Sequence, residues 1–506
     1  MPKLPAICAG VVAAAAMAFA TGASATTITS PTQVNNTASP FAIGCAGPGH
    51  DNTGTLAENG EVEPWVSVDQ SNTQNVAGAW QQDRWSDGGS HGLVSSVSQD
   101  GGATFGGDEF PDFSRCPLFA HYGNPDAQDP GKQFDRGSDP WVSWGNDNRL
   151  YQIGLTVSEP EFGLGVNSGI LASYSDDFGA TWSHPAVLKS DTSRGGSVLN
   201  DKESITADPD GQHVYAIWDR LQVGGSTNVP LQTTENAIGY RGQTWFSESS
   251  DRGQTWSPAR IIYDPGEVNQ TIANQIAVTR NGTLVDTFIL IRNFSNAHKN
   301  RGLSVATMRS TDNGATWSKP TIVSNLVDQT VTTPGDNKPL RTGDTIPDIA
   351  VDPTSDNVYV SWQDARSGTP AIYTSTSTDD GKTFGPPVQA SDSPAGVSAF
   401  TGSVDVNSDG TVAVTYYDFR NDTSDTSTAL TDYWITFSTD GGQSWSPSQR
   451  VTNPSFNMKD APIARGFFVG DYEGLDHAGS DFKLFFVQAH PPAGNPTDVY
   501  TSTVTP

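Results

Sequence analysis

One short polar motif recurs six times along the chain, and this repetition constrains the fold more than any other feature. The pattern is Ser-x-Asp-x-Gly-x-Thr/Ser-Trp/Phe, and its aspartates follow one another at intervals of 61 to 77 residues. The copies span 98–105, 175–182, 249–256, 310–317, 377–384 and 438–445. A motif with such a period marks a repeated supersecondary unit, because every unit must close in the same way.

Each motif ends a longer unit, and the units share one order of strands and turns. In SITADPDGQHVYAIWDR (204–220), an alternating strand reaches a turn rich in Asp and Gly, and a second strand ends in Trp, Asp and Arg. A third strand then leads into the motif and a fourth leaves it. Units begin near Trp65, Trp141, Ile205, Ile276, Ile349 and Val404, and a seventh unit with GDYEGLDHAG (470–479) lacks the motif.

Helical periodicity is absent almost everywhere, so the sequence predicts an all-β fold. Four-stranded antiparallel sheets that repeat radially form a β-propeller. We expect seven blades, or six if the two termini share one blade. The prediction places the propeller at 61–506 as a single domain, after an N-terminal extension at 26–60.

The motif itself is best interpreted as a turn that closes each unit. Its Gly permits positive φ, and its Ser and Asp side chains can bind backbone amides that the strands leave free. The Trp or Phe can wedge between neighbouring sheets. A catalytic role is the alternative, but six copies of a reactive group are not expected where one site suffices. We therefore predict that the motif is scaffold.

The N-terminus indicates export. Lys3 precedes an apolar, alanine-rich run from 6 to 20 and small residues at 23–25, which is typical of a signal peptide over 1–25. We therefore expect a secreted protein, extracellular or periplasmic, with no membrane segment after cleavage. Export leaves Cys45 and Cys116, which we predict to form one disulfide, with two free thiols as the alternative.

The charge balance excludes some partners. Asp and Glu number 56 against 28 Lys and Arg, a formal net charge of −28 at pH 7. Such a surface repels nucleic acid. No zinc-binding spacing or Gly-rich phosphate loop appears, so we expect no metal and no cofactor. Asp-rich turns such as 208–211 could hold calcium but fit tight turns equally well. We expect a monomer.

Charged residues gather at the ends of strands that lie opposite the motif. First strands begin near Glu63, Asp139, Glu203 and Asp348. Second strands end near Arg84, Arg220, Arg292, Arg366 and Arg420, most of them beside an Asp. A ring of such residues around one mouth could bind an anionic or polyhydroxylated ligand. The alternative, which we favour for most pairs because they recur, is a structural salt bridge in each unit.

The six motifs resemble the Asp-boxes, or BNR repeats, of sialidases and their relatives, and the resemblance covers essentially the whole chain after the signal peptide. It implies a glycan-active propeller. Sialidases use an arginine triad to bind the substrate carboxylate, an Asp as acid, and a Tyr nucleophile paired with a Glu. A neutral Tyr suits an anomeric carbon that already bears a carboxylate.

Carried over to this chain, the resemblance implies catalytic roles for three residues. The stretch GDYEGL points to Tyr472 as the nucleophile, and ESITADPDGQHVYAIWDR points to Glu203 as its partner. The loop QQDRWSDGGSHG points to Asp87 as the acid, with Asp83 as second choice.

The implied substrate-binding residues are arginines at the ends of second strands. They are Arg84, Arg220, Arg292 and Arg366. The first strand opens with Glu63-Pro64-Trp65 where sialidases have Arg-Ile-Pro, so Arg84 would have to replace the missing arginine.

The sequence therefore favours an enzyme, a secreted sialidase-like glycoside hydrolase that acts on terminal acidic sugars of glycans. One alternative is a non-catalytic glycan-binding or adhesion propeller that keeps the polar ring. Another is a different glycan-active enzyme, such as a polysaccharide lyase that uses Tyr and Arg on uronates.

Overall fold

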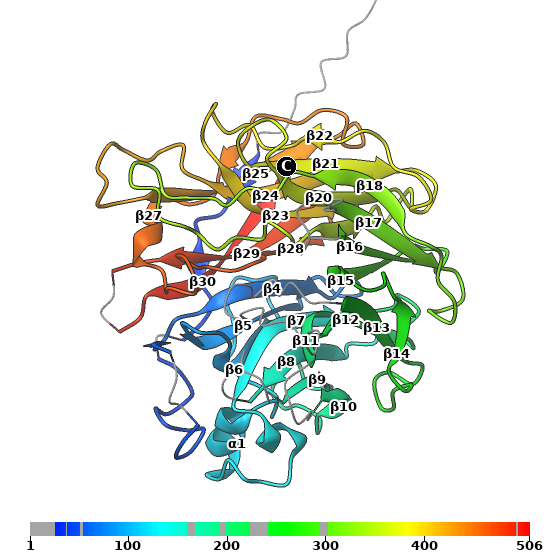
Figure 1. Ribbon diagram of the computed structural model, residues 1–506, viewed down its shortest axis with the longest axis vertical. Helices are drawn as coiled ribbons and strands as arrows, with labels where there is room; N and C mark the ends of the chain where they lie inside the picture. The colour runs from blue at the N-terminus through cyan, green and yellow to red at the C-terminus, as the bar shows by residue number, and fades with distance from the viewer. Residues whose placement is uncertain are drawn as a thin grey trace, which may run out of the picture.

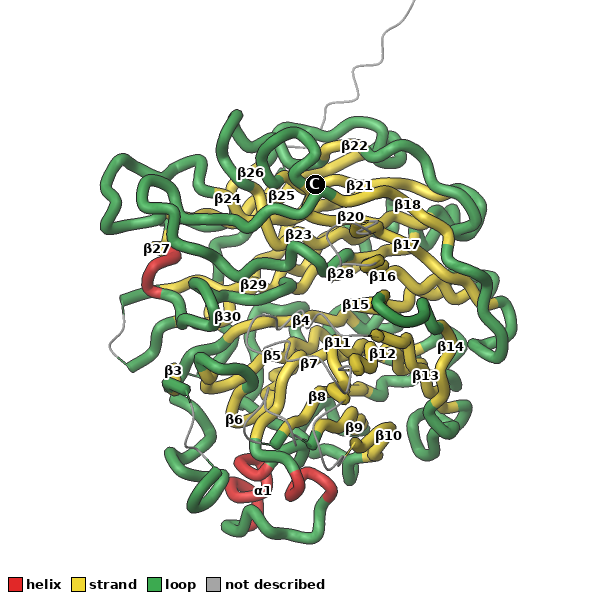
Figure 2. Tube along the Cα trace, in the orientation of Figure 1, coloured by secondary structure: helices red, strands yellow, loops and turns green. Residues whose placement is uncertain are grey.

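The computed structural model describes residues 26–36, 38–50, 54–158, 167–191, 198–222, 241–292, 302–491 and 494–506. The predicted signal peptide, residues 1–25, lies outside this part. The described chain is all-β, and Figure 2 shows few helical segments beside the strands. They are α1 (Arg115–Tyr122) and the 3-10 turns η1 (Pro130–Gln133) and η3 (Met458–Asp460). No described helix is long and apolar enough to cross a membrane.

The strands follow one another as antiparallel meanders, in which each strand pairs with the next one along the chain. The first meanders are β4 (Val62–Val68), β5 (Val76–Trp85) and β6 (Ser90–Ser98); β7 (Arg136–Trp144), β8 (Leu150–Val157), β9 (Ser168–Ser175) and β10 (Ala186–Asp191); and β11 (Val198–Ala207), β12 (Val214–Gln222), β13 (Arg241–Ser249) and β14 (Arg260–Tyr263).

The later meanders repeat the same order. They are β15 (Asn269–Val278), β16 (Leu284–Arg292), β17 (Gly302–Ser310) and β18 (Thr321–Leu326); β19 (Asp348–Val351), β20 (Val358–Asp364), β21 (Ala371–Ser377) and β22 (Val388–Gln389); β23 (Ala399–Val406), β24 (Val412–Asp418), β25 (Leu430–Ser438) and β26 (Gln449–Arg450); and β28 (Gly474–Ala478), β29 (Asp481–Ala489) and β30 (Thr497–Thr505). Strand β27 (Phe456–Asn457) pairs with β25.

The first strands of these meanders stand side by side around the middle of the molecule. Strand β4 lies beside β7, and β11, β15, β19, β23 and β28 follow in turn until β28 lies beside β4. All of these strands line one central cavity of ≈ 170 Å³. Figure 1 shows β4, β7, β11, β15, β23 and β28 near the centre, with outer strands such as β10, β14, β18 and β22 toward the rim.

The N-terminal segment joins the last meander to the first. Strands β1 (Thr27–Ile28) and β2 (Thr32–Gln33) pair with β30, while β3 (Leu56–Ala57) pairs with β5. Residues from opposite ends of the chain therefore share a sheet, and the extension packs as part of the same body.

Aromatic residues on the second strands form much of the core. Trp80, Trp218 and Trp362 occupy similar places on β5, β12 and β20 and are fully buried. Each indole N–H donates a hydrogen bond, to Gln82, Asn200 and Asp364 respectively, at 3.0–3.2 Å. A buried indole requires such a partner, because an unsatisfied N–H costs free energy.

All six motifs adopt one hydrogen-bonded turn, which confirms their interpretation as scaffold. In the copy at 249–256, Ser249 Oγ donates to Asp251 Oδ1 at 2.8 Å and accepts from the backbone of Gly253 at 2.7 Å. Asp251 then accepts from both the backbone and the hydroxyl of Thr255. The same bonds recur around Asp100, Asp177, Asp312, Asp379 and Asp440.

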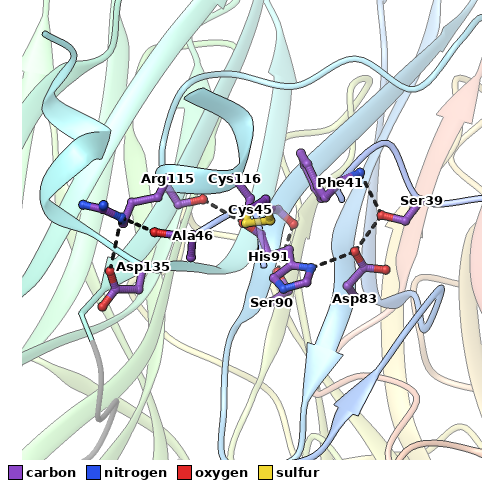
Figure 3. The surroundings of a disulfide bond; sticks show 12 residues. Ser39, Phe41, Cys45, Ala46, Asp83, Ser90, His91, Arg115, Cys116 and Asp135 are labelled. Atoms are coloured by element: carbon purple, nitrogen blue, oxygen red, sulfur yellow. Dashed lines mark hydrogen bonds and ion pairs between the residues drawn. A yellow bond between two sulfur atoms is a disulfide. The ribbon is translucent and has the colours of Figure 1, made fainter. Parts of the chain in front are cut away.

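The predicted disulfide is confirmed. Cys45 and Cys116 are bonded, with their Cα atoms 4.9 Å apart, and the bond joins the N-terminal segment to α1 (Figure 3). Arg115 reinforces the junction by donating from Nε to the carbonyl of Ala46 at 2.6 Å. His91 lies next to the disulfide and binds Asp83 at 3.0 Å.

Candidate active site at the central mouth

The six repeated motifs, which we call boxes from here on, and the charged strand ends lie at opposite ends of the sheets, as predicted. At one end of β12, Val214 pairs with Ser249, where a box begins, and Arg220 lies toward the other end. In β20, Val358 pairs with the box residue Ser377, while Asp364 is at the far end. We call the end of the central cavity where the first strands begin the mouth.

A bulge near the start of the first strands turns one side chain out of the regular alternation. In β4, β7, β11, β15 and β23 the strand register shifts at this point. The bulged residues have positive φ between 48° and 62°, and they are Glu63, Asp139, Lys202, Ala273 and Thr401. None is glycine, and such backbone conformations concentrate at functional sites.

Three of these bulged residues meet around one ammonium group. Lys202 Nζ lies 3.0 Å from Asp139 Oδ2 and 3.5 Å from Glu63 Oε1. It also donates to Asp471 Oδ2 at 2.8 Å. Lys202, Asp139 and Asp471 are only 5%, 3% and 1% exposed. Strands β4, β7 and β11 and the segment before β28 thus converge on a buried ion cluster.

Arg341 adds a second cation to this cluster. It grips Asp471 with two nitrogens, and the Nε to Oδ1 distance is 2.9 Å. Its NH2 group lies 3.7 Å from Glu63 Oε1. Its guanidinium also lies over the ring of Phe468, 4.2 Å from the centroid. Arg341 precedes β19, so it reaches the cluster from another part of the ring.

The pKa values of the carboxyl groups in the cluster are shifted in opposite directions. Burial raises the pKa of Glu63 to about 8, although Lys202 opposes the change. Burial would also raise the pKa of Asp139, but Lys202 outweighs it and the pKa is lowered. Arg341 and Lys202 likewise overcome burial and hold the pKa of Asp471 far below its usual value. Protonated and ionised carboxyls therefore stand side by side at neutral pH.

Tyr472 lies at the cluster within an aromatic group. Its ring contacts Trp65 and Trp141, with centroids 6.0 and 5.3 Å away, and the two indoles stack at 3.4 Å. Its hydroxyl donates to the carbonyl of Pro140 at 3.2 Å. Burial raises the pKa of Tyr472 well above its usual value, and Glu63 adds to the shift.

Glu203 follows Lys202 directly and is also buried. Neither of its carboxyl oxygens has a hydrogen-bond partner among the described residues. Burial raises the pKa of Glu203 well above its usual value, and the nearby carboxyl of Asp139 adds to the shift. The structure brings Glu203 and Tyr472 to the same cluster, within electrostatic range, without a hydrogen bond between them.

Asp87 and Asp83 point to other partners. Asp87, whose side chain is 36% exposed, pairs with Arg136 NH1 at 2.8 Å. Asp83 pairs with His91 and accepts from Ser39 at 2.6 Å, beside the disulfide. The structure places neither carboxylate against Lys202.

The predicted substrate-binding arginines mostly bind partners within or next to their own meander. Arg220 grips Asp191 at 2.9 Å and stacks on Trp245. Arg366 binds Ser324 at 2.8 Å and Asp364 at 2.5 Å, and stacks on Tyr373. Arg292 donates to Ser304 at 2.8 Å.

Arg84 is the one predicted arginine that lies close to the mouth. It donates to Gln81 at 2.7 Å, and Gln81 in turn donates to Glu63. Its guanidinium lies 5.1 Å from the centroid of Phe468, the ring that Arg341 also contacts. Arg84 is therefore linked to the cluster by a side-chain hydrogen-bond chain.

Sequence reasoning missed Lys202, Arg341 and Asp471 and gave Glu63 and Asp139 only as charges at the start of first strands. A usable signal was present. Glu63-Pro64-Trp65 and Asp139-Pro140-Trp141 repeat an acid, Pro and Trp at the same place, and the third unit has Lys202-Glu203-Ser204 there. A repeat in which an acid is replaced by a base suggests that those side chains face one another.

Asp405, Asp476 and His477 have ligand atoms close enough to surround a metal ion. His477 Nδ1 lies 2.9 Å from Asp405 Oδ2. Burial opposes its ionisation, but Asp405 raises the pKa of His477 to about 11. A protonated imidazole is itself the cation of the group and offers no lone pair to a metal. Cys45, Cys116 and His91 also lie close together, but both cysteines belong to the disulfide.

Comparison with protein families gives two matches. A model described as a BNR repeat-like domain matches residues 243–346, and a BNR/Asp-box repeat model matches 436–447. Together with the six motifs, these matches support an assignment to the sialidase/BNR-repeat superfamily. No curated protein matches the chain.

Several solved structures are similar to the chain at low sequence identity. A Hadza microbial sialidase is 17% identical over 81% of this chain and 73% of its own, with a TM-score of 0.46. An alpha-L-arabinanase from Penicillium chrysogenum is 10% identical, with coverages of 94% and 98% and a TM-score of 0.46. A mutant of the NanB sialidase from Streptococcus pneumoniae is 11% identical, with coverages of 95% and 98% and a TM-score of 0.46.

Proposed function

We propose that the protein is a secreted glycoside hydrolase, built as a seven-bladed β-propeller, whose chemistry takes place at the central mouth. The ring of first strands from β4 to β28 and back to β4 supports the blade count, because each strand would begin one blade. The disulfide is consistent with export, since such bonds persist in oxidising compartments.

The observation that carries the proposal is the opposed ionisation of the carboxyl groups around Lys202. Glycoside hydrolysis requires one carboxylic acid to protonate the leaving oxygen and one carboxylate to act as base or nucleophile. Glu63, with its pKa raised to about 8, suits the acid. Asp139, held ionised by Lys202, suits the carboxylate. Both contact the same ammonium, which fixes their relative position.

The substrate we propose is a glycan with a terminal acidic sugar. Arg341 and Arg84, which both contact the ring of Phe468, are arginines close to the cluster, and guanidinium groups suit a sugar carboxylate. The sialidase resemblance adds a second version of the chemistry, in which Tyr472 attacks and Glu203 takes its proton. That version rests on Glu203 and Tyr472 lying within electrostatic range of each other, and it requires Glu203 to be ionised when Tyr472 attacks.

The test is turnover of sialosides, uronate polymers, arabinosides and other neutral glycosides by the wild type and matched variants. Asp139→Asn and Glu63→Gln should lower kcat/KM by about 10²–10⁴-fold, the usual contribution of acid–base groups. Asp409→Asn, an exposed carboxylate on a strand turn, is the control and should have no effect.

The outcomes separate the alternatives. Loss of turnover in Tyr472→Phe but not in Asp139→Asn would favour the tyrosine chemistry. Binding of a glycan without turnover would indicate the adhesion protein, and release of an unsaturated uronate would indicate a lyase. Activity that survives all three substitutions would refute the site.

A further inference from the structure

A segment between β18 and β19, residues 327–347, packs on Asp471 of the ion cluster at the mouth; we call it the strap. Part of it is a compact hairpin, because the Leu340 backbone donates to the carbonyl of Val331 at 2.9 Å and Thr332 bridges to Pro339. The hairpin is thus braced by its own hydrogen bonds.

The inner end of the strap covers the ion cluster. The backbone of Arg341 donates to the carbonyl of Phe467 at 3.1 Å, and its side chain grips Asp471. A Cβ added at Gly343 would lie 2.1 Å from the carbonyl oxygen of Asp471. The strap backbone therefore packs directly on the residue that holds Lys202, and only a glycine permits so close an approach.

The outer end of the strap has a separate ionic anchor. Asp336 binds Lys459 Nζ at 2.8 Å, and Lys459 also donates to the carbonyl of Thr426 at 2.6 Å. Lys459 and Asp336 are partly exposed, with side chains 13% and 29% accessible. This anchor is outside the ion cluster, so it can be altered without touching Glu63, Asp139 or Lys202.

From this arrangement we propose that the strap is a lid, which must lift from the mouth before a ligand reaches Asp139 and Lys202. The cluster under it is almost fully buried, whereas its own first residues, 327–330, are exposed. The two anchors join the strap to the segment between β26 and β28, where Lys459, Phe467 and Asp471 lie. Opening would break these contacts and also expose Val331, Leu340 and Ile346, which are buried against the core, while the strand pairing within the meanders would remain.

The experiment compares the wild type with Lys459→Met, which removes the outer anchor. Hydrogen–deuterium exchange reports opening of peptides that cover 327–347. Labelling with a water-soluble carbodiimide and glycine ethyl ester, read by mass spectrometry, reports access to Asp139 and Asp471. Asp409, exposed on a turn far along its strand from the mouth, is the labelling control.

We expect exchange in the strap and labelling of Asp139 and Asp471 to rise together, by about two- to fivefold, the factor that loss of a surface ion pair gives. Labelling of Asp409 should not change. Asp336→Asn should give the same result, and the double variant should add nothing to either single change.

Faster exchange without faster labelling would overturn the proposal, because the strap would then open without exposing the cluster. Unchanged exchange would overturn it too, since the outer anchor would then hold nothing. Neither measurement needs turnover, so the outcome is independent of whether the protein is a hydrolase.

Discussion

Replacing Lys202 by Met tests whether the cluster at the mouth is ionised as the structure implies. The substitution keeps much of the side-chain volume and removes the ammonium that Asp471, Asp139 and Glu63 share at 2.8–3.5 Å. Removing one partner of a buried ion pair leaves uncompensated charge and costs about 3–5 kcal/mol. Because Arg341 still binds Asp471, the uncompensated charge is mainly that of Asp139, and we expect the lower end of this range.

The loss should depend on pH in a defined direction. In the wild type the pKa values of Asp139 and Asp471 lie below their usual range, so both groups stabilise the fold above about pH 4 and lose this contribution as pH falls. Without Lys202, burial raises the pKa of Asp139, so the ionised form destabilises the fold at neutral pH. The difference in unfolding free energy between wild type and variant is therefore largest near pH 7 and smaller near pH 4.

Urea unfolding at pH 7 and pH 4 measures these differences. Lys459→Met is the matched control, because the same substitution there removes a partly exposed pair with Asp336 worth about 0.2–1 kcal/mol. A loss for Lys202→Met no larger than that of the control would refute the argument. So would a loss that is equal at the two pH values.

Two further outcomes follow from the scaffold. Ser249→Ala removes the hydroxyl that binds Asp251 and the buried backbone of Gly253, so the free energy of unfolding should fall by about 1–3 kcal/mol. Turnover per folded molecule should stay unchanged. Lost activity at unchanged stability would contradict the scaffold role of the motif. The Cys45–Cys116 disulfide closes a loop with a sequence separation of 71, and reducing it should lower the free energy of unfolding by about 4 kcal/mol in the chain-entropy model. Urea unfolding with and without reductant measures this loss. An unchanged unfolding midpoint would count against a stabilising role of the disulfide.

The parts of the molecule that local chemistry determines could be predicted from the sequence. The box turn is one example, because Ser249, Asp251, Gly253 and Thr255 are close along the chain and satisfy one another. The disulfide is another, since export leaves two cysteines. The predicted salt bridge between neighbouring Asp and Arg residues forms in two units, where Arg366 binds Asp364 and Arg420 binds Asp418. Elsewhere the partner is different, and Arg220 binds Asp191 from the preceding meander.

The ion cluster was not predicted because its side chains meet through backbone conformation. The bulge with positive φ is shared by Glu63, Asp139 and Lys202, but also by Ala273 and Thr401, which carry no charge. No single unit tells which of these positions face one another, and only a comparison of the repeats, in which Lys202 stands where two other units have an acid, points to it. Arg341 was missed for another reason. It lies in a long connection without strand periodicity, and only the path of the strap brings it to Asp471.

The most direct test of the central claim is the position of a bound glycan. A crystal structure of the Asp139→Asn variant, soaked with an oligosaccharide that the wild type cleaves, would show it. Our account predicts the scissile glycosidic oxygen at the mouth, within about 3 Å of the Glu63 carboxyl, with the strap displaced from Asp471. A glycan bound at the box end of the sheets or on the outer rim, with the cluster still covered, would contradict it.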